Sequence, residues 1–353
     1  MQDLNELTSR SGEWLSGGGR EADVVVSCRV RLARNVAGFP FLTRADDEKR
    51  KEIEHYVKEK LQKTQVGQTT NYWDLQELSQ VDRQLLVERH LISRDHAFGR
   101  GPRGVAFGPD EKVSIMVNEE DHLRIQALRA GLELEEAFRL ANEVDNDLEK
   151  EIDYAFSSQF GYLTACPTNV GTGLRVSVML HLPALVITRE IDKVFQAVSK
   201  INLAVRGLYG EGTQASGDFY QISNQVTLGK SEEEIIENLS SVIPQIVKYE
   251  RKVRQTLLQS KRLVLEDKIW RAVGVLRFAR SISSEETMEL LSLVRLGVNL
   301  GLIQDIPITT VNELFVLSQP AHLQKIERAQ LNSHERDEVR ARYIRERLAR
   351  NGR

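Results

Sequence analysis

Two stretches in the first two-thirds of the chain alternate between hydrophobic and polar residues, and this pattern predicts β-strands. One runs from Val24 to Arg34 and the other from Val176 to Leu182. A third, short strand is predicted for Lys112–Val117. Within the first stretch, Arg29 and Arg31 are two positions apart and therefore share one face of the strand. Two like charges on one face either lie in solvent or bind an anion.

Helical patterns occupy several segments between these strands and the whole end of the chain. Residues 46–63 place hydrophobic residues four apart in a charged background, and residues 132–152 are also predicted to be helical. Ser231–Glu234 is a capping box that opens a further helix, in which Pro244 is expected to cause a kink. After about residue 255 the strand patterns stop, so we expect an all-helical region to follow.

Length and composition limit the possible classes of protein. A chain of 353 residues is too long for one comfortable core, so two domains are expected. The formal charge of −3 argues against a wholesale binder of nucleic acid or membrane surfaces. The two cysteines, far apart in the sequence, fit a reducing compartment. The polar start lacks a signal-peptide core and no run approaches about 20 apolar residues, so a cytoplasmic protein without membrane attachment is predicted.

The stretch Cys166–Arg175 combines a thiol, two glycines and an arginine within ten residues. Gly171 and Gly173 could let the backbone present N–H groups to an anion. Arg175 could bind phosphate oxygens with its planar, forked guanidinium group. A cysteine in such surroundings more often packs than reacts, so the thiol alone does not decide the chemistry.

Three consecutive acids, Glu119–Asp121, follow the strand predicted for residues 112–117. Such a run at the end of a strand is usually only solvated. Carboxylates have a specific catalytic function where a guanidinium group is the nucleophile. That group keeps its proton at physiological pH, so it must be aligned by carboxylates and relieved of a proton as the N–P bond forms.

The stretch Cys166–Arg175 resembles the signature of the phosphagen (guanidino) kinases, which transfer the γ-phosphate of ATP to a guanidinium nitrogen. Three further blocks resemble the same family and occur in the same order: Ser27–Arg34, Asn118–Arg124 and Arg206–Glu211. The resemblance implies an α+β fold, with an antiparallel β-sheet flanked by helices in a catalytic domain at residues 1–255. An all-helical C-terminal domain at residues 256–353, for oligomerisation and phosphoarginine binding, would complete the chain.

The resemblance also implies roles for individual residues, with ATP and Mg2+ as cofactors. Glu120 would act as base and clamp, Glu211 would be the second substrate carboxylate, and Cys166 would tune the orientation and charge of the guanidinium group. Glu119 would contact magnesium through water, so no side chain is expected to bind the metal directly. Tyr209 stands where relatives carry a further arginine, which would lower the positive charge there by one unit. The implied ATP-binding residues are Ser27, Arg29, Arg31, His90, Arg124, Arg175 and Arg206.

The basic end of the chain narrows the resemblance to the protein-arginine kinases within this family. Taken alone, residues 335–347 are most simply a solvated helix, with nucleic-acid contact as the next possibility. The motif Arg336-Asp337-x-x-Arg340-Ala341, however, resembles the phosphoarginine receptor of the protein-arginine kinases. It implies an allosteric site in which Arg336 and Arg340 bind the phosphoryl group and Asp337 binds the guanidinium nitrogens.

These features predict an ATP-dependent protein-arginine kinase that marks proteins for the stress response and for Clp-dependent degradation. Metabolic relatives carry a helical domain before the block at Ser27, and only 26 residues precede it here, so we expect an open site that admits an arginine within a protein. The partners that the resemblance implies are an McsA-type activator, a CtsR-type repressor as substrate, the Clp protease machinery and further copies of the chain in a homodimer or higher oligomer.

Two alternatives remain. A metabolic kinase for free arginine, or for another small guanidino compound, would share every catalytic residue. A non-catalytic regulator that binds phosphoarginine or nucleic acid would not need the complete active site.

Overall fold

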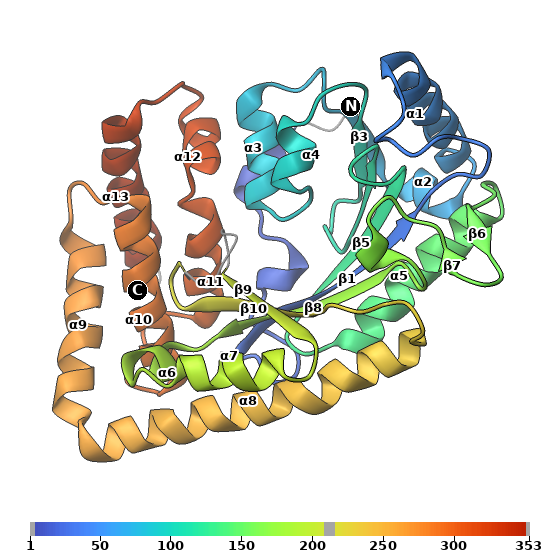
Figure 1. The fold of residues 1–353 in the computed structure, drawn as a ribbon. Helices are drawn as coiled ribbons and strands as arrows, with labels where there is room; N and C mark the ends of the chain where they lie inside the picture. Colours follow the sequence, from blue (N-terminus) through green and yellow to red (C-terminus); the bar gives the residue numbers. More distant parts are fainter. Residues whose placement is uncertain (1–3, 208–215, 351–353) are drawn as a thin grey trace.

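The computed structural model describes residues 4–207 and 216–350, and its centre is an eight-stranded sheet in which every neighbouring pair is antiparallel. The strand order across the sheet is β2-β3-β4-β5-β1-β8-β10-β9, with β1 near the middle (Figure 1). The strands are β1 (Val25–Arg34), β2 (Asn71–Asp74), β3 (Gly104–Phe107), β4 (Val113–Val117), β5 (Leu123–Ala130), β8 (Leu174–His181), β9 (Leu203–Gly207) and β10 (Phe219–Asn224). A small second sheet pairs β6 (Phe156–Ser157) with β7 (Gly161–Tyr162). The predicted antiparallel sheet is thus confirmed.

The alternation along β1 and β8 gives the sheet one apolar and one polar face. In the register between these strands, Val30 lies opposite Val176 and Cys28 lies opposite Val178. These four side chains are buried in the main hydrophobic core. The arginines at the intervening positions point to the other face of the sheet.

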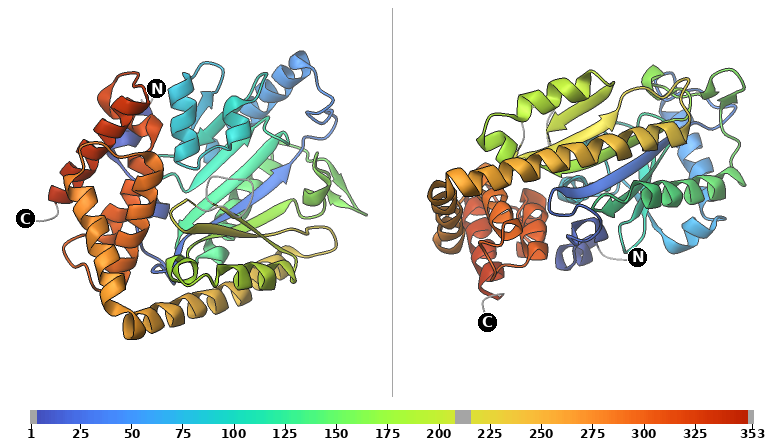
Figure 2. Two further views of the ribbon diagram at one scale, coloured as in Figure 1. Left: turned by 60° about the vertical axis from the view of Figure 1, so that its left-hand side comes forward. Right: turned by 90° about the horizontal axis from the view of Figure 1, so that it is seen from below.

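Two long helices cover the apolar face. The helix α5 (Leu134–Glu149) packs on β1 and β5, and α8 (Glu232–Ser260) packs on β8 and β10 (Figure 1, Figure 2). The capping box predicted at Ser231 is confirmed, because its hydroxyl accepts a hydrogen bond from the Glu234 N–H at 3.1 Å and the Glu234 carboxylate accepts one from the Ser231 N–H at 2.9 Å. The helix then continues through Pro244.

Shorter helices connect the strands, and five helices form the end of the chain beside the sheet (Figure 1). No helix among the described residues is both long enough and apolar enough to cross a membrane. The connecting helices are α1 (Asp47–Leu61), α2 (Gln65–Thr69), α3 (Gln80–Glu88), α4 (Arg94–Phe98), α6 (Pro183–Ile187) and α7 (Ile191–Ser199), with the short 3-10 helices η1 (Leu4–Ser9), η2 (Glu13–Leu15) and η3 (Pro167–Asn169). The terminal helices are α9 (Arg262–Phe278), α10 (Ser284–Asn299), α11 (Ile308–Leu317), α12 (Pro320–Glu327) and α13 (Ser333–Arg350).

A buried polar chain joins these terminal helices to the sheet. Arg295 of α10 donates to Nδ1 of His181 at 2.9 Å, and Nε2 of the same ring lies 2.9 Å from the Ser292 hydroxyl. That hydroxyl in turn donates to the Asp218 carboxylate at 2.6 Å. The bond from Arg295 requires an unprotonated Nδ1, so His181 is neutral, with its proton on Nε2. Burial, together with Arg295 and Arg254, holds the pKa of His181 well below its ordinary value.

We therefore expect His181 to make the folded chain sensitive to acid. Unfolded, this histidine gains a proton near pH 6.5, whereas the folded ring stays neutral, so its contribution to the free energy of unfolding falls as the pH drops below about 6.5 by up to about 1.4 kcal/mol per unit. Denaturant unfolding between pH 7.5 and 5 should therefore show a shallower pH dependence in His181→Gln than in the wild type. His334→Gln, at an exposed side chain, is the control. Equal slopes in all three proteins would contradict the assignment.

Candidate active site

The polar face of the sheet gathers the arginines that the sequence predicts as phosphate ligands. Arg31 of β1 lies directly opposite Arg175 of β8, and Arg29 lies opposite Ser177. Arg206 of β9 lies opposite Gln221, whose side-chain oxygen accepts a hydrogen bond from Arg29 at 2.8 Å. Antiparallel pairing thus brings residues from separate blocks of the sequence onto one surface.

Three of the arginines on this surface have no carboxylate partner among the described residues. No carboxylate there pairs with Arg29, Arg31 or Arg175. Burial, followed by the nearby Arg124 and Arg175, lowers the pKa of Arg29 to about 10. The pKa of Arg31 is lowered further by burial and by the same neighbours together with Arg29. The Nε–H groups of Arg31 and Arg175 are buried and have no hydrogen-bond partner among the described residues. This set of donors fits the phosphate groups of a nucleotide.

Two cavities meet over these arginines and share Arg31, Ser93, Asp95 and Arg206. The larger, of about 570 Å³, contains Arg175 and the acids of the β4–β5 turn. The other, of about 350 Å³, combines apolar side chains with the arginines, and its apolar part fits a nucleotide base. Its walls include Trp14, Leu15, Val26, Leu128, Phe315 and Val316, together with the predicted residues Ser27 and His90.

His90 is held at the apolar cavity by an unusual backbone conformation. Its φ is +58°, and its carbonyl oxygen accepts a hydrogen bond from Gln126 of β5 at 2.7 Å. The ring meets Trp14 edge to face, with 5.1 Å between centroids. Burial, with Arg29 nearby, lowers the pKa of His90 to about 3. A neutral ring suits contact with an uncharged base rather than with a phosphate.

The β4–β5 turn carries the predicted carboxylates at one end of the arginine surface. Glu119 lies 2.7 Å from Arg124 and accepts a hydrogen bond from Ser93 at 2.7 Å. Although burial raises the pKa of Glu119, Arg124 and Ser93 bring it below its ordinary value. Glu120 lies 3.1 Å from Arg124, and its side chain is 42 % exposed at the larger cavity. Glu119 is therefore ionised and Glu120 remains accessible to a substrate.

Asp121, in the same turn, has a positioning role that the sequence did not indicate. One of its oxygens accepts hydrogen bonds from Asn35 and from the backbone N–H of Ala165, both at 2.6 Å. This carboxylate therefore ties the catalytic turn to the loop that carries Cys166. The partners are distant in the sequence, so only the folded structure reveals the contact.

Cys166 also lines the larger cavity, where its sulfur lies 3.0 Å from the Thr168 hydroxyl. The expectation that the following glycines present N–H groups to an anion is wrong for Gly171, because it exchanges two backbone hydrogen bonds with Tyr162. Gly173 has a φ of +65°, and a Cβ there would lie 2.6 Å from the carbonyl oxygen of Ala33. These glycines serve close packing of the loop.

Two predicted features fall in the gap in the described residues. Glu211 and Tyr209 lie outside the described ranges, so the structure says nothing of the second carboxylate or of the missing family arginine. Arg206, three residues before Tyr209, lines both cavities.

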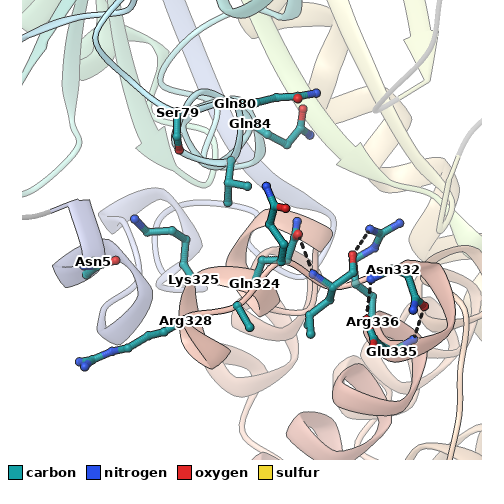
Figure 3. A pocket seen from close by; sticks show the side chains of 14 residues that line it. Asn5, Ser79, Gln80, Gln84, Gln324, Lys325, Arg328, Asn332, Glu335 and Arg336 are labelled. Carbon is teal, nitrogen blue, oxygen red and sulfur yellow. Dashed lines mark hydrogen bonds between the residues drawn. The ribbon is translucent and has the colours of Figure 1, made fainter.

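The predicted receptor residues lie far from the sheet, on α13. Arg336 lines a cavity of about 1080 Å³ between α3 and α12–α13 and donates to the carbonyl oxygen of Leu331 at 2.8 Å (Figure 3). Arg340 is 1 % exposed and does not line this cavity. Its guanidinium group donates to the carbonyl oxygens of Ser318 and Ile282 and to Asp337. Ala341 is buried in the core. The structure therefore does not bring Arg336 and Arg340 to one cavity.

Comparison with family models agrees with this geometry. Residues 52–253 match the C-terminal catalytic domain of the ATP:guanido phosphotransferases, and residues 262–353 match the protein-arginine kinase McsB C-terminal domain. Among solved structures, the fold is similar to a lombricine kinase, with 27 % identity and a TM-score of 0.58 over 72 % of each chain. It is also similar to a duplicated taurocyamine kinase from Schistosoma mansoni, with 25 % identity and a TM-score of 0.60 over 81 % of this chain and 40 % of that one. The chain is therefore a guanidino phosphotransferase.

Relatives that match over nearly the full length show to which group of guanidino phosphotransferases the chain belongs. The chain is 52 % identical to the protein-arginine kinase of Desulforamulus reducens, with 98 % of both chains covered. It is 50 % identical to that of Moorella thermoacetica, over 96 % of this chain and 98 % of the relative. The chain belongs to the protein-arginine kinase family, which confirms the predicted fold and enzyme class.

Two arginines of β1 should respond oppositely to replacement by methionine. Arg31 opposes another arginine, whereas Arg34 is 1 % exposed and bound to Asp145 at 2.7 Å. Arg31→Met should therefore stabilise the nucleotide-free protein by up to about 1 kcal/mol and reduce the stabilisation by ADP. Arg34→Met leaves a buried carboxylate unpaired and should cost about 3–5 kcal/mol. Urea unfolding with and without Mg-ADP measures the free energy of unfolding of both variants. Equal destabilisation by the two changes would disprove the claim that Arg31 lacks a counterion.

Proposed function

We propose that the two joined cavities bind Mg-ATP along the arginine surface and that Glu120 aligns the guanidinium group of a protein-bound arginine. The observation that carries this proposal is the placement of unpaired arginines next to an accessible carboxylate. The apolar cavity with His90 would hold the base, and Arg29, Arg31, Arg175 and Arg206 would bind phosphate oxygens. Arg124, already paired with Glu119 and Glu120, would link the phosphates to the carboxylates.

Transfer at this site depends on alignment and electrostatics. The N–P bond forms as the bond from the γ-phosphorus to its bridging oxygen breaks, with the electron pair leaving on ADP. Glu120, with Glu211 as the second proposed carboxylate, orients the nucleophile and accepts the proton that the guanidinium group loses. Alignment of this kind can supply about 7–11 kcal/mol of barrier reduction. Magnesium, with Glu119 holding it through water, would add positive charge between the phosphates.

Cys166 would act beside the substrate rather than as a covalent nucleophile. It lines the same cavity as Glu120, and its sulfur would tune the orientation and charge of the guanidinium group. The exposed side of Glu120 supports a site that admits an arginine carried by a polypeptide.

A direct assay tests the acceptor. The purified protein is incubated with Mg-ATP and either casein or free arginine, and acid-labile, base-stable phosphate is measured on each. We expect label on casein, and none in Glu120→Ala, whose thermal unfolding should match that of the wild type because the side chain is partly exposed. Label on free arginine alone would support a metabolic kinase, and full activity of Glu120→Ala would disprove the carboxylate mechanism.

The cavity at Arg336 is proposed as an allosteric phosphoarginine site. Arg336 and Arg328 carry positive charge at its wall, and Asn332 and Gln80 add polar groups. A phosphoryl group is a strong acceptor for such donors. Arg340 and Asp337 are bonded to each other and do not line this cavity. Only after exchanging these partners would Arg340 bind the phosphoryl group and Asp337 the guanidinium nitrogens.

Replacing Arg336 should separate regulation from chemistry. Arg336→Ala is expected to keep basal phosphorylation of casein, because the residue is remote from the arginine surface. It should lose most of any stimulation by added free phosphoarginine, measured as the initial rate across a concentration series. Glu338→Ala, an exposed neighbour on the same helix, serves as the control. Undiminished stimulation in Arg336→Ala would disprove the site.

The family further suggests a place for the enzyme in the cell. We propose a cytoplasmic kinase of the stress response that marks proteins for the Clp protease machinery, with a CtsR-type repressor among its substrates and an McsA-type activator. Self-association is supported by large exposed apolar side chains on α9, including Leu263, Trp270 and Phe278.

A further inference from the structure

The helix α3 of the catalytic part lies beside α12 of the terminal helices (Figure 1). Two sets of polar contacts join them. One is the ion pair between Asp82 and Lys325 at 2.6 Å, which is partly exposed. The other is centred on Glu88, at the end of α3, which is 2 % exposed. Glu88 is two residues before His90, which lines the nucleotide cavity, whereas Asp82 lies in the first turn of α3.

Glu88 supplies the cap that α12 lacks in its own sequence. The N-cap residue Gln319 makes no side-chain capping bond. The two oxygens of Glu88 accept hydrogen bonds from the backbone N–H of Ala321 at 2.9 Å and from that of His322 at 3.2 Å. Nδ1 of His322 adds a third bond at 2.9 Å. A buried carboxylate at a helix N-terminus is a strong and directional link.

The next two residues extend this link to the nucleotide cavity. Arg89 is 1 % exposed, pairs with Glu111, and donates to Nε2 of His322 at 3.3 Å. His90 follows at a φ of +58°, lines the apolar cavity and is bonded through its carbonyl oxygen to Gln126. The start of α12 and the proposed base pocket are therefore joined by three consecutive residues.

The cavity of about 1080 Å³ adjoins the same two helices (Figure 3). Gln80 and Gln84 of α3 form one wall, and Gln324 and Lys325 of α12 form another. Gln84 also approaches Glu88, at 3.4 Å. A ligand in this cavity contacts both helices and can change how α12 sits against the end of α3.

We propose that Glu88 is a positioning residue that couples this cavity to the nucleotide site, by fixing the start of α12 to the segment that holds His90. Occupation of the cavity by phosphoarginine then changes the affinity for ATP, and ATP changes the affinity for phosphoarginine by the same factor. The regulatory part of this inference rests on the phosphoarginine site proposed above.

Glu88→Gln tests the coupling, because glutamine keeps the shape of the side chain but places an NH2 group among the N–H donors of α12. Asp82→Asn is the matched control, since it removes the other link between the same helices. The KM for ATP and the kcat on casein are measured for each protein with and without free phosphoarginine. In Glu88→Gln we expect the KM for ATP to rise about fivefold or more, a smaller change in kcat, and loss of the phosphoarginine effect on KM. Asp82→Asn should keep the wild-type KM for ATP in the absence of phosphoarginine, because it leaves the contacts of Glu88 intact; its partner Lys325 lines the cavity, so this KM is the property that the control compares.

A second, milder variant shows whether the effects of Glu88→Gln arise only because that variant fails to fold. His322→Gln removes one donor to Glu88 but leaves its two backbone bonds, so it should fold and show the same changes at smaller size. A wild-type KM for ATP and an intact phosphoarginine effect in both Glu88→Gln and His322→Gln would overturn the proposal, as would an equal rise in the KM for ATP in Asp82→Asn measured without phosphoarginine. If the wild type itself ignored phosphoarginine, the receptor would fail, whereas the KM for ATP in Glu88→Gln would still decide the positioning role.

Discussion

The register between β1 and β8 places two arginine side chains directly opposite each other, and the site depends on this repulsive arrangement. The sheet can hold it because the opposite faces of the same strands are buried against α5 and α8. Burial of the apolar side chains of β1 and β8 therefore stabilises the sheet. This stabilisation offsets the repulsion between Arg31 and Arg175 on the opposite face. An anion that bridges them relieves the repulsion and gains several charge-assisted hydrogen bonds.

Two arginines of β1, three positions apart, have different surroundings. Arg31 faces the cavity, whereas Arg34 is bonded to Asp145 and stacks 3.5 Å from the centroid of the Tyr162 ring. Arg34 also donates to the carbonyl oxygen of Thr172 at 2.9 Å, which fixes the loop between Cys166 and β8. The loop that carries Cys166 thus depends on a buried cation that does not line either cavity.

Much of the fold and part of the site could be predicted from the sequence. Period-two alternation predicted β1 and β8, and the spacing of Arg29 and Arg31 predicted a shared face. The pairing of Arg31 with Arg175 could not be predicted from pattern alone, because register between distant strands leaves no local signal. Asp121 and Glu88 were missed for the same reason, since their partners are backbone and side-chain N–H groups far away in the sequence. Gly171 does adopt a positive φ, but its N–H bonds to Tyr162 instead of facing an anion, because the pairing of these two segments leaves no local signal in the sequence.

The helix α8 runs unbroken from Glu232 to Ser260 and so crosses the point where the strand patterns of the sequence end. Its residues contribute to a core shared with the terminal helices. A catalytic fragment ending near residue 255 would cut this helix and remove Ser292 and Arg295. His181 and Asp218 would then lose partners that are now buried with them. The catalytic and C-terminal parts that the family models distinguish therefore share buried polar contacts. Expressing the catalytic part alone would require new polar partners for His181 and Asp218.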